Sequence, residues 1–309
     1  MSRLITVDAE YVMPQLAASY LREEGGEVAF IETATSLCVP KLLAALAKEG
    51  LAPEAVRWII VTHVHLDHAG GASALMKACP NATLLAHPRA ARHLIDPAKL
   101  VASAKQVYGE DAFDALYGVI EPIDAARVRS LDDGAEVHLG DAPLRFVHTR
   151  GHANHHFVVH DVHRDVVFTG DTFGLVYPAL QRAARFAYPS TSPTDFDGEA
   201  AVASVRRVVD LKPRAVGPTH FGLFEDVQVI AEQLIRWLEL SANLVAQGTK
   251  SGDERGTLEQ RFKWQLEQEF ELAASRAGLS LTAQDRKLIH FDLELNAQGL
   301  AFAATRPPK

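Results

Sequence analysis

The stretch VTHVHLDHAGG, residues 61–71, decides how the rest of the chain is interpreted. It gathers four potential metal ligands within a few positions: His63, His65, Asp67 and His68. The continuous apolar run WIIV at 58–61 comes just before them and predicts a strand buried on both faces. Two glycines follow, and we expect a helix over about 70–78.

The spacing of these four residues favours convergence on one small volume. Side chains alternate along a strand, so His63 and His65 project to the same side where the apolar run ends. Asp67 and His68 come at the turn into the following helix. Imidazole and carboxylate ligands suit zinc, iron or manganese, and the lack of thiolates argues against a structural zinc site. The alternative is that these groups only cap a helix, but capping needs one aspartate and no histidines.

Three further candidate ligands each follow an expected strand. His152 lies in TRGHANHH, Asp171 in VVFTGD and His220 in AVGPTH. Open α/β sheets place their sites at the carboxyl ends of strands. Taken singly, each residue also fits an ordinary structural role, and it is the combination with residues 61–71 that is specific.

The wider pattern alternates strands and helices and predicts an α/β fold. The first part of the chain predicts strands at 27–32, 82–87, 135–139, 144–149, 156–160, 165–169 and 214–218. Helices are expected at 40–50 and 202–209, with a mixed, mostly helical insertion at 94–127. From about residue 227 the pattern changes to three amphipathic helices, with a polar loop at 251–256.

Composition limits the classes of partner. The chain has 309 residues and a formal net charge of −8, so we expect neither a nucleic-acid nor a membrane partner. The N-terminal residues have no apolar core of signal-peptide length, which favours a cytoplasmic location. Cys38 and Cys79 fall in no ligand-like spacing and fit buried thiols in a reducing compartment. A small-molecule substrate is expected, and a homo-oligomer is left open.

The motifs THVHLDHAGG, TRGHANHH, FTGD and THFG together resemble the metallo-β-lactamase-fold hydrolase superfamily, over roughly residues 20–225. Their surroundings look like an uncharacterised small-molecule hydrolase subgroup of it. The resemblance implies a four-layer αβ/βα sandwich with metals at one edge between two sheets. We therefore expect a metallo-β-lactamase-fold domain at 1–226. A helical C-terminal extension at 227–309 should pack on that domain or on a partner chain.

The resemblance also implies a ligand set for two divalent ions, with zinc expected and iron or manganese as alternatives. The first ion would be held by His63, His65 and His152, the second by Asp67, His68 and His220, with Asp171 bridging both. Many relatives carry Asp-Thr-Gly where this chain has Glu32-Thr33-Ala34, a position that supports the site without binding metal. His156 is expected to support the site, and His87, His148 and His155 are expected to be structural.

The same resemblance implies hydrolysis by a metal-bridging hydroxide. Two ions about 3.5–4 Å apart can share a hydroxide that attacks a carbonyl or phosphoryl centre. Asp67 would orient it and pass a proton to the leaving group. The substrate would be a small ester, lactone, thioester or similar compound. The alternative is a mononuclear iron oxidoreductase of the persulfide dioxygenase type, and intact ligands disfavour a non-catalytic scaffold.

Substrate contacts are expected from the stretch after Asp171, TFGLVYPALQRAARFAYPSTSPTDFD, which has no clear strand pattern. Segments beside a rigid site commonly hold specificity groups. Aromatic rings can form an apolar wall and arginine can bind a carboxylate or phosphate. The candidates are Tyr177, Arg182, Arg185 and Tyr188. The alternative is a solvated turn of helix at 179–186 whose arginines only meet water.

Overall fold

The computed structural model describes residues 2–191 and 195–306, so residues 192–194 of the proposed substrate-contacting stretch lie outside it. The chain divides into two compact units. Unit 1 comprises Met1–His148, His155–Gly170 and Arg214–Phe224, and unit 2 comprises Thr149–Asn154, Asp171–Pro213 and Glu225–Lys309. The boundary expected near residue 226 stays a prediction.

The first sheet of unit 1 has six strands in chain order: β1 (Ser2–Asp8), β2 (Ala18–Glu24), β3 (Glu27–Ile31), β4 (Val56–Ile60), β5 (Thr83–Ala86) and β6 (Val128–Ser130). β1 to β3 are antiparallel and β3 to β6 are parallel. The sequence pattern does not predict β1, β2 or β6. In β2, the charged Arg22 is fully buried and pairs with Asp161 at 2.5 Å, so a buried strand carries a polar sequence.

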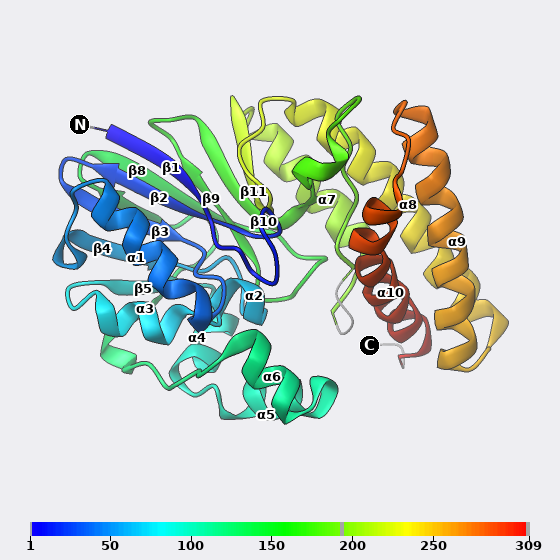
Figure 1. Cartoon of the computed structure of the whole chain (residues 1–309), viewed down its shortest axis with the longest axis horizontal. Coiled ribbons are helices and arrows are strands. Elements are labelled where there is room, and N and C mark those ends of the chain that lie inside the picture. Colours follow the sequence, from blue (N-terminus) through cyan, green and yellow to red (C-terminus); the bar gives the residue numbers. More distant parts are fainter. Residues whose placement is uncertain (1, 192–194, 307–309) are drawn as a thin grey trace. The chain divides into compact units, whose positions relative to one another are not determined.

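Helices cover one face of this sheet (Figure 1): α1 (Val39–Lys48), α3 (Ala72–Ala78) and α4 (Pro88–Ile95). Their leucines, such as Leu42 and Leu75, pack against sheet residues such as Phe30 and Ile59. The helix expected over 70–78 is α3 preceded by the short α2 (Leu66–Ala69). The insertion contains α5 (Ala98–Tyr108) and α6 (Glu110–Tyr117). Short 3-10 helices lie at Ser36–Cys38, Pro53–Ala55, Ala125–Arg127 and Pro178–Leu180.

The second sheet has the order β11-β10-β9-β8-β7. Its strands are β7 (Glu136–Leu139), β8 (Ala142–His148), β9 (Phe157–Asp161), β10 (Val166–Leu175) and β11 (Ala215–His220). An apolar core that includes Tyr20, Ile60, Phe146 and Phe168 joins strands of both sheets. The expectation that strand pattern ends before Asp171 is wrong, because β10 continues to Leu175 with every residue buried.

Unit 2 contains α7 (Gly198–Asp210), α8 (Val227–Ser251), α9 (Arg255–Arg276) and α10 (Ala283–Thr305). The apolar stripe of α9 is buried as predicted, at Leu258, Phe262, Leu266 and Phe270. Thr282 caps α10, and its side chain and that of Asp285 form a capping box. Two sheets with helices and a helical C-terminal extension match the fold class that the sequence predicts. In the part of the chain that is described, no helix has the length and apolarity to span a membrane.

Candidate metal centre

Strand β4 leads directly into the histidine-rich stretch of unit 1. His65 is the N-cap of α2, which places Asp67 and His68 in the first turn of that helix. Gly70 and Gly71, which follow α2, are needed because other backbone atoms lie too close to them for a side chain. A Cβ on Gly71 would lie 2.5 Å from the carbonyl oxygen of Thr33, closer than side chains allow. The turn therefore holds the candidate ligands in a tightly packed backbone.

Three imidazoles of this stretch lie together. His63 Nε2 is 2.9 Å from His65 Nδ1, and the ring centres of His63 and His68 are 4.0 Å apart. Thr62 Oγ1 lies 3.0 Å from the other nitrogen of His63. His63 and His68 are both fully buried. The expectation that His63 and His65 project to the same side agrees with this geometry.

A carboxylate and two imidazoles form a second group in unit 1. Asp67 Oδ2 is 3.6 Å from His68 Nε2 and 3.4 Å from His220 Nε2. One ligand atom from each of the three residues lies within 4.8 Å of the others. The side chain of Asp67 is 27% exposed, whereas those of His68 and His220 are almost fully buried. The accessible member of the group is therefore the carboxylate.

The orientation of His220 is set by the backbone. Its Nδ1–H donates to the carbonyl oxygen of Leu16 at 2.7 Å. A carbonyl only accepts hydrogen bonds, so Nδ1 carries a proton, and in the neutral ring the lone pair is on Nε2. Metal-binding histidines commonly have their other ring nitrogen anchored in this way. Leu16 could not be found from sequence, because every residue carries a carbonyl.

Glu32 supports His68 from the opposite side. Its Oε2 lies 3.5 Å from His68 Nδ1, and its Oε1 accepts the backbone N–H of Thr62 at 3.3 Å. Glu32 is 1% exposed and has a φ of +67°. The carboxylate thus contacts the candidate ligand His68 and the backbone of Thr62, and its supporting role stays a prediction.

In unit 2, His152 has the same two kinds of neighbour as His220 has in unit 1: a backbone carbonyl at Nδ1 and a carboxylate near Nε2. His152 Nδ1 donates to the carbonyl oxygen of Ser190 at 3.1 Å, and its Nε2 lies 3.4 Å from Asp171 Oδ2. Both side chains are almost fully buried. The pair lines a hollow of unit 2 whose other lining residues are Arg150, Thr172, Pro189, Ser190, Ala201, Ser204 and Leu238.

Gly170, the residue before Asp171, is closely packed within unit 1. Gly170 is the last residue of unit 1 before Asp171. A Cβ on Gly170 would lie 2.5 Å from Thr62 Oγ1 and 2.6 Å from His156 Nε2. His156 is fully buried, with its ring centre 4.9 Å from that of His63. Gly170 therefore packs on Thr62, the residue before the candidate ligand His63, and Asp171 follows Gly170 directly in the chain.

Three further histidines of unit 1, those expected to be structural, contact other rings or the backbone. The ring centres of His87 and His148 are 4.1 Å apart, and His87 Nδ1 accepts the N–H of Arg89 as the N-cap of α4. Burial lowers the pKa of His87 to about 4, with smaller effects from neighbouring basic groups. His148 Nε2 donates to the carbonyl oxygen of Leu131 at 3.0 Å. His155 stacks 6.1 Å from the ring of His63.

The four residues expected to contact substrate lie in unit 2 among its own helices. Arg182 donates to both oxygens of Asp285, at 2.6 and 3.0 Å, and Arg185 donates twice to Asp226, at 2.7 and 3.0 Å. Tyr177 and Tyr188 are 3% and 1% exposed. The alternative in which these arginines only meet water is therefore wrong, and their predicted contact with substrate stays a prediction.

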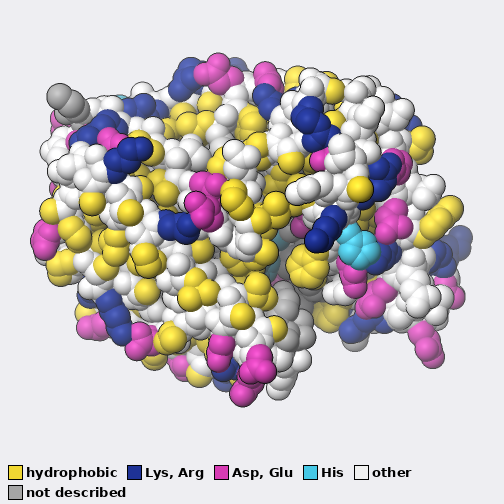
Figure 2. Space-filling view, in the orientation of Figure 1, with side chains coloured by type: hydrophobic (Ala, Val, Ile, Leu, Met, Phe, Trp, Pro, Cys, Tyr) yellow, Lys and Arg dark blue, Asp and Glu magenta, His cyan; other side chains and the backbone are white. Residues whose placement is uncertain are grey.

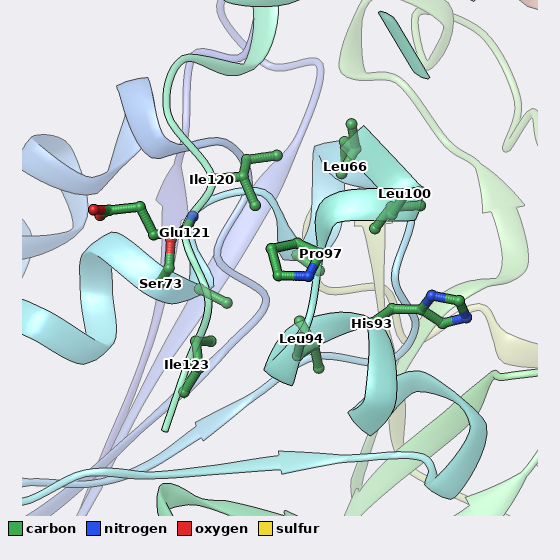
Figure 3. A pocket seen from close by; sticks show the side chains of 11 residues that line it. Leu66, Ser73, His93, Leu94, Pro97, Leu100, Ile120, Glu121 and Ile123 are labelled. Carbon is green, nitrogen blue, oxygen red and sulfur yellow. The ribbon is translucent and has the colours of Figure 1, made fainter. Parts of the chain in front are cut away.

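A small apolar hollow of unit 1 adjoins α2 (Figure 3). Leu66, Leu94, Pro97 and Leu100 line it, and the figure shows the His93 ring directed away from its centre. Leu66 is the first residue of α2 and is 8% exposed. We interpret the hollow as the packing seam that anchors α2, the helix that carries two candidate ligands.

Surface charge is mixed on the face that Figure 2 shows. Acidic and basic side chains are interspersed with apolar ones there, and no broad basic area is visible among the described residues of this face. This pattern gives that face no strong field for a polyanion.

The donor set fits a divalent cation. Imidazole nitrogens and carboxylate oxygens are the ligands that zinc, iron and manganese share, and here they are buried or half-buried and close together. In the neutral rings of His152 and His220, the two Nδ1–carbonyl bonds put the lone pair on Nε2, on the side of a carboxylate oxygen, so each ring and its neighbouring carboxylate could donate a lone pair to the same cation.

Comparison with known proteins agrees with this chemistry. The family model of the metallo-beta-lactamase superfamily matches residues 14–220. A metallo-beta-lactamase fold-containing protein of Sulfurisphaera tokodaii is 31% identical over 169 residues, which are 54% of this chain and 60% of that protein. Glyoxylase B2 of Dictyostelium discoideum is 28% identical over 174 residues, 55% of this chain and 50% of that protein. The aligned parts thus span only about half of each curated relative.

Solved structures extend the likeness in fold. The crystal structure of an archaeal metallo-beta-lactamase superfamily protein from Sulfolobus tokodaii has a TM-score of 0.67 and 22% identity. It covers 96% of this chain and 97% of its own, a span too wide to leave out the three C-terminal helices. With the family model matching two thirds of its length, the chain belongs to the metallo-beta-lactamase superfamily, a family of metal-dependent hydrolases for the most part.

Proposed function

We propose that this protein is a dinuclear metallo-hydrolase, with zinc as the expected metal, that acts on a small ester, lactone, thioester or similar substrate. The observation that carries the proposal is the group of Asp67, His68 and His220, whose ligand atoms lie within 4.8 Å of one another. His63 and His65 lie beside this group with their ring nitrogens 2.9 Å apart. Adjacent ligand groups of this kind are how dinuclear hydrolases hold two ions.

The proposed ligand sets are those that the family resemblance implies. One cation would be held by His63, His65 and His152, the other by Asp67, His68 and His220, and Asp171 would serve both. Chain connectivity supports the inclusion of Asp171, because it follows Gly170, which packs on Thr62. The anchored tautomer of His152 supports its inclusion as a ligand.

Asp67 is the proposed proton carrier. When bound, the cations would polarise the oxygen of the scissile bond and make water more acidic. Asp67 is the most exposed of the unit 1 ligand candidates in its group, and its carboxylate can accept a proton from water and pass it to the leaving group. The buried rings of His63 and His68 limit solvent on their side of the carboxylate.

Substrate recognition by the segment after Asp171 is also a proposal. Tyr177 and Tyr188 would supply apolar surface, and Arg182 or Arg185 would bind an anionic group. Each arginine already contacts a carboxylate of unit 2, so a substrate anion would have to compete with that carboxylate. This competition favours neutral over anionic substrates.

The proposal is tested by metal analysis and a hydrolysis screen on the same samples. Protein purified without added metal should hold about two zinc ions per chain and hydrolyse a lactone, thioester, phosphodiester or β-lactam. His220→Ala should lose this activity, whereas His138→Ala, at an exposed histidine, should keep it. One iron per chain together with persulfide oxidation would instead identify the oxidoreductase alternative.

A further inference from the structure

Tyr20 lies in the core between the two sheets of unit 1. It belongs to β2, is fully buried, and its ring centre is 4.9 Å from that of Phe168. Gly217 on β11 makes room for it, since a Cβ there would lie 3.0 Å from Tyr20 Cζ and 3.1 Å from its hydroxyl oxygen. The phenol therefore lies directly against the backbone that leads to His220.

The hydroxyl of Tyr20 occupies the inside of the turn that carries His220. Two backbone hydrogen bonds between Val216 and Phe224, of 2.8 and 2.9 Å, close this turn. The hydroxyl oxygen is 2.7 Å from the carbonyl oxygen of Pro218 and 3.0 Å from that of Gly222. These carbonyls lie two residues before and two residues after His220.

The phenol is a suitable donor for these two carbonyls. Burial raises the pKa of Tyr20 well above its ordinary value, with a smaller effect of the nearby Glu32, so the hydroxyl keeps its proton. Carbonyls only accept, so two that converge on one point need a donor between them. Leaving a buried acceptor unsatisfied is costly, and the turn would rearrange to avoid that.

We infer that Tyr20 is a positioning residue for His220. Its hydroxyl holds the turn in the conformation that directs His220 Nε2 toward Asp67 Oδ2 at 3.4 Å. The hydrogen bond from His220 to Leu16 fixes the rotation of the ring, and Tyr20 fixes the backbone that carries the ring. The inference rests on the proposed function in that this group would hold one of the two cations.

The test is Tyr20→Phe, which removes one oxygen and keeps the ring. Full-length protein treated with a chelator is titrated with Zn²⁺, and the stoichiometry and both affinities are measured. We expect one ion to bind as in the wild type and the other to bind about 10- to 100-fold more weakly, as is typical when a residue that supports a ligand is lost. If each of the two ions binds to Tyr20→Phe with the same affinity as to wild type, the inference is overturned.

Trp58→Phe is the matched control. It removes a ring donor to a backbone carbonyl in the same core, the bond from Trp58 Nε1 to the carbonyl oxygen of His138 at 2.8 Å, away from the His220 turn. Both ions should bind to this variant as to wild type, even if its melting temperature falls. An equal loss of one ion in both variants would show a general effect of core damage and would also overturn the inference.

A metal-independent readout separates this inference from the proposed function. In histidine-labelled apoprotein, NMR should show a slowly exchanging Nδ1–H of His220 in wild type and Trp58→Phe, and faster exchange in Tyr20→Phe. If wild type binds fewer than two zinc ions, the dinuclear proposal fails, and the exchange rates alone decide the role of Tyr20. Unchanged exchange in Tyr20→Phe would refute that role.

Discussion

The imidazole of His220 donates its Nδ1–H to the carbonyl oxygen of Leu16 over 2.7 Å. His152 makes the same bond to the carbonyl oxygen of Ser190 over 3.1 Å. In both residues Nε2 then lies 3.4 Å from a carboxylate oxygen. Because a backbone carbonyl selects the tautomer, the neutral ring of each residue carries its lone pair on Nε2, which is the form that the proposed metal centre requires.

The shared carboxylate of the proposed centre gives the first prediction. Asp171→Asn keeps the size of the side chain and removes its charge, so a ligand that serves both cations becomes weaker for both. We expect the occupancy of both ions to fall, measured by metal analysis after dialysis against a weak chelator. If Asp171 served one ion only, a single ion would be lost.

Asp141→Asn is the control for this experiment, because it removes the same charge at an exposed position. It should retain about two ions per chain. The bridging role of Asp171 is wrong if Asp171→Asn also retains two tightly held ions under conditions in which the control does.

The backbone before the site gives the second prediction. Ala34 is buried and has a φ of +51°, a region that costs a residue with a Cβ about 1–2 kcal/mol. Glycine avoids that cost but raises the entropy of the unfolded chain, by about 0.4–1 kcal/mol. Ala34→Gly should therefore raise the free energy of unfolding by about 0.5–1 kcal/mol in urea titrations.

Ala74→Gly, inside helix α3, is the opposite control and should lower the free energy of unfolding by about 1 kcal/mol. A destabilised Ala34→Gly would mean that the methyl group matters more than the backbone. That group packs in a small cluster with Ala9 and Cys38.

Clustered residues of metal-binding type could be identified from the sequence. The three histidines and one aspartate at 63–68 have few reasons to cluster other than metal binding, and the structure places them close to one another. The apolar run at 58–61 likewise lies within and just after a buried strand. Both features are local, so the neighbouring letters are enough to identify them.

Features that depend on distant partners could not be predicted in this way. The partner of Arg22, Asp161, is 139 positions away in the sequence, and both side chains are fully buried. Arg182 looked available to a substrate, but Asp285 lies 103 positions further on. Ser190 and Leu16 act through backbone carbonyls, which leave no trace in the sequence.

The ion pair between Arg182 and Asp285 gives the third prediction. The guanidinium, followed by the hydrogen bonds of Thr282, lowers the pKa of Asp285 from 3.8 to about 2. Folding therefore favours the ionised carboxylate, so its stabilisation is fully present above pH 3.8 and is lost as the pH falls toward 2. We expect a contribution of roughly 2 kcal/mol, because the carboxylate is almost fully buried.

Asp285→Asn measures this contribution. The difference in free energy of unfolding between wild type and Asp285→Asn should shrink between pH 5 and pH 3, with urea as denaturant. Asp226→Asn is the matched control, since Asp226 pairs with Arg185 but is half exposed, and its difference should be small at every pH. A constant difference for Asp285→Asn across this range would contradict the assigned cause.

The same arginines allow a kinetic test of substrate binding. If Arg182 or Arg185 binds a substrate anion, its replacement by alanine should raise KM for anionic substrates and leave metal content unchanged. A charge-assisted hydrogen bond of roughly 1.5–3 kcal/mol implies about a 10- to 150-fold loss in kcat/KM. Wild-type kinetics in both variants, on a substrate that is turned over, would leave these arginines with their structural ion pairs alone.

The C-terminal helices give the last prediction. Phe270 of α9 lies 5.0 Å, between ring centres, from both Phe186 and Tyr188, which are nearly fully buried. Asn296 of α10 accepts the backbone N–H of Thr191 at 2.7 Å. Truncation at residue 226 would expose the rings of Phe186 and Tyr188 and would remove the hydrogen-bond acceptor of the Thr191 N–H. We expect the truncated protein to be insoluble or unfolded when its solubility and circular dichroism are measured.

Single substitutions in α9 measure how much its packing contributes to stability without removing a whole segment. Phe270→Ala should lower the free energy of unfolding by about 3–5 kcal/mol, because it leaves a cavity among the rings of Phe186, Tyr188 and Trp237. Trp264→Ala, on the same helix but 61% exposed, should change it by less than about 0.5 kcal/mol. A soluble truncation with full metal content would contradict the prediction, because the segment before residue 226 would then not need the helices. A small effect of Phe270→Ala on the free energy of unfolding would contradict it in the same way.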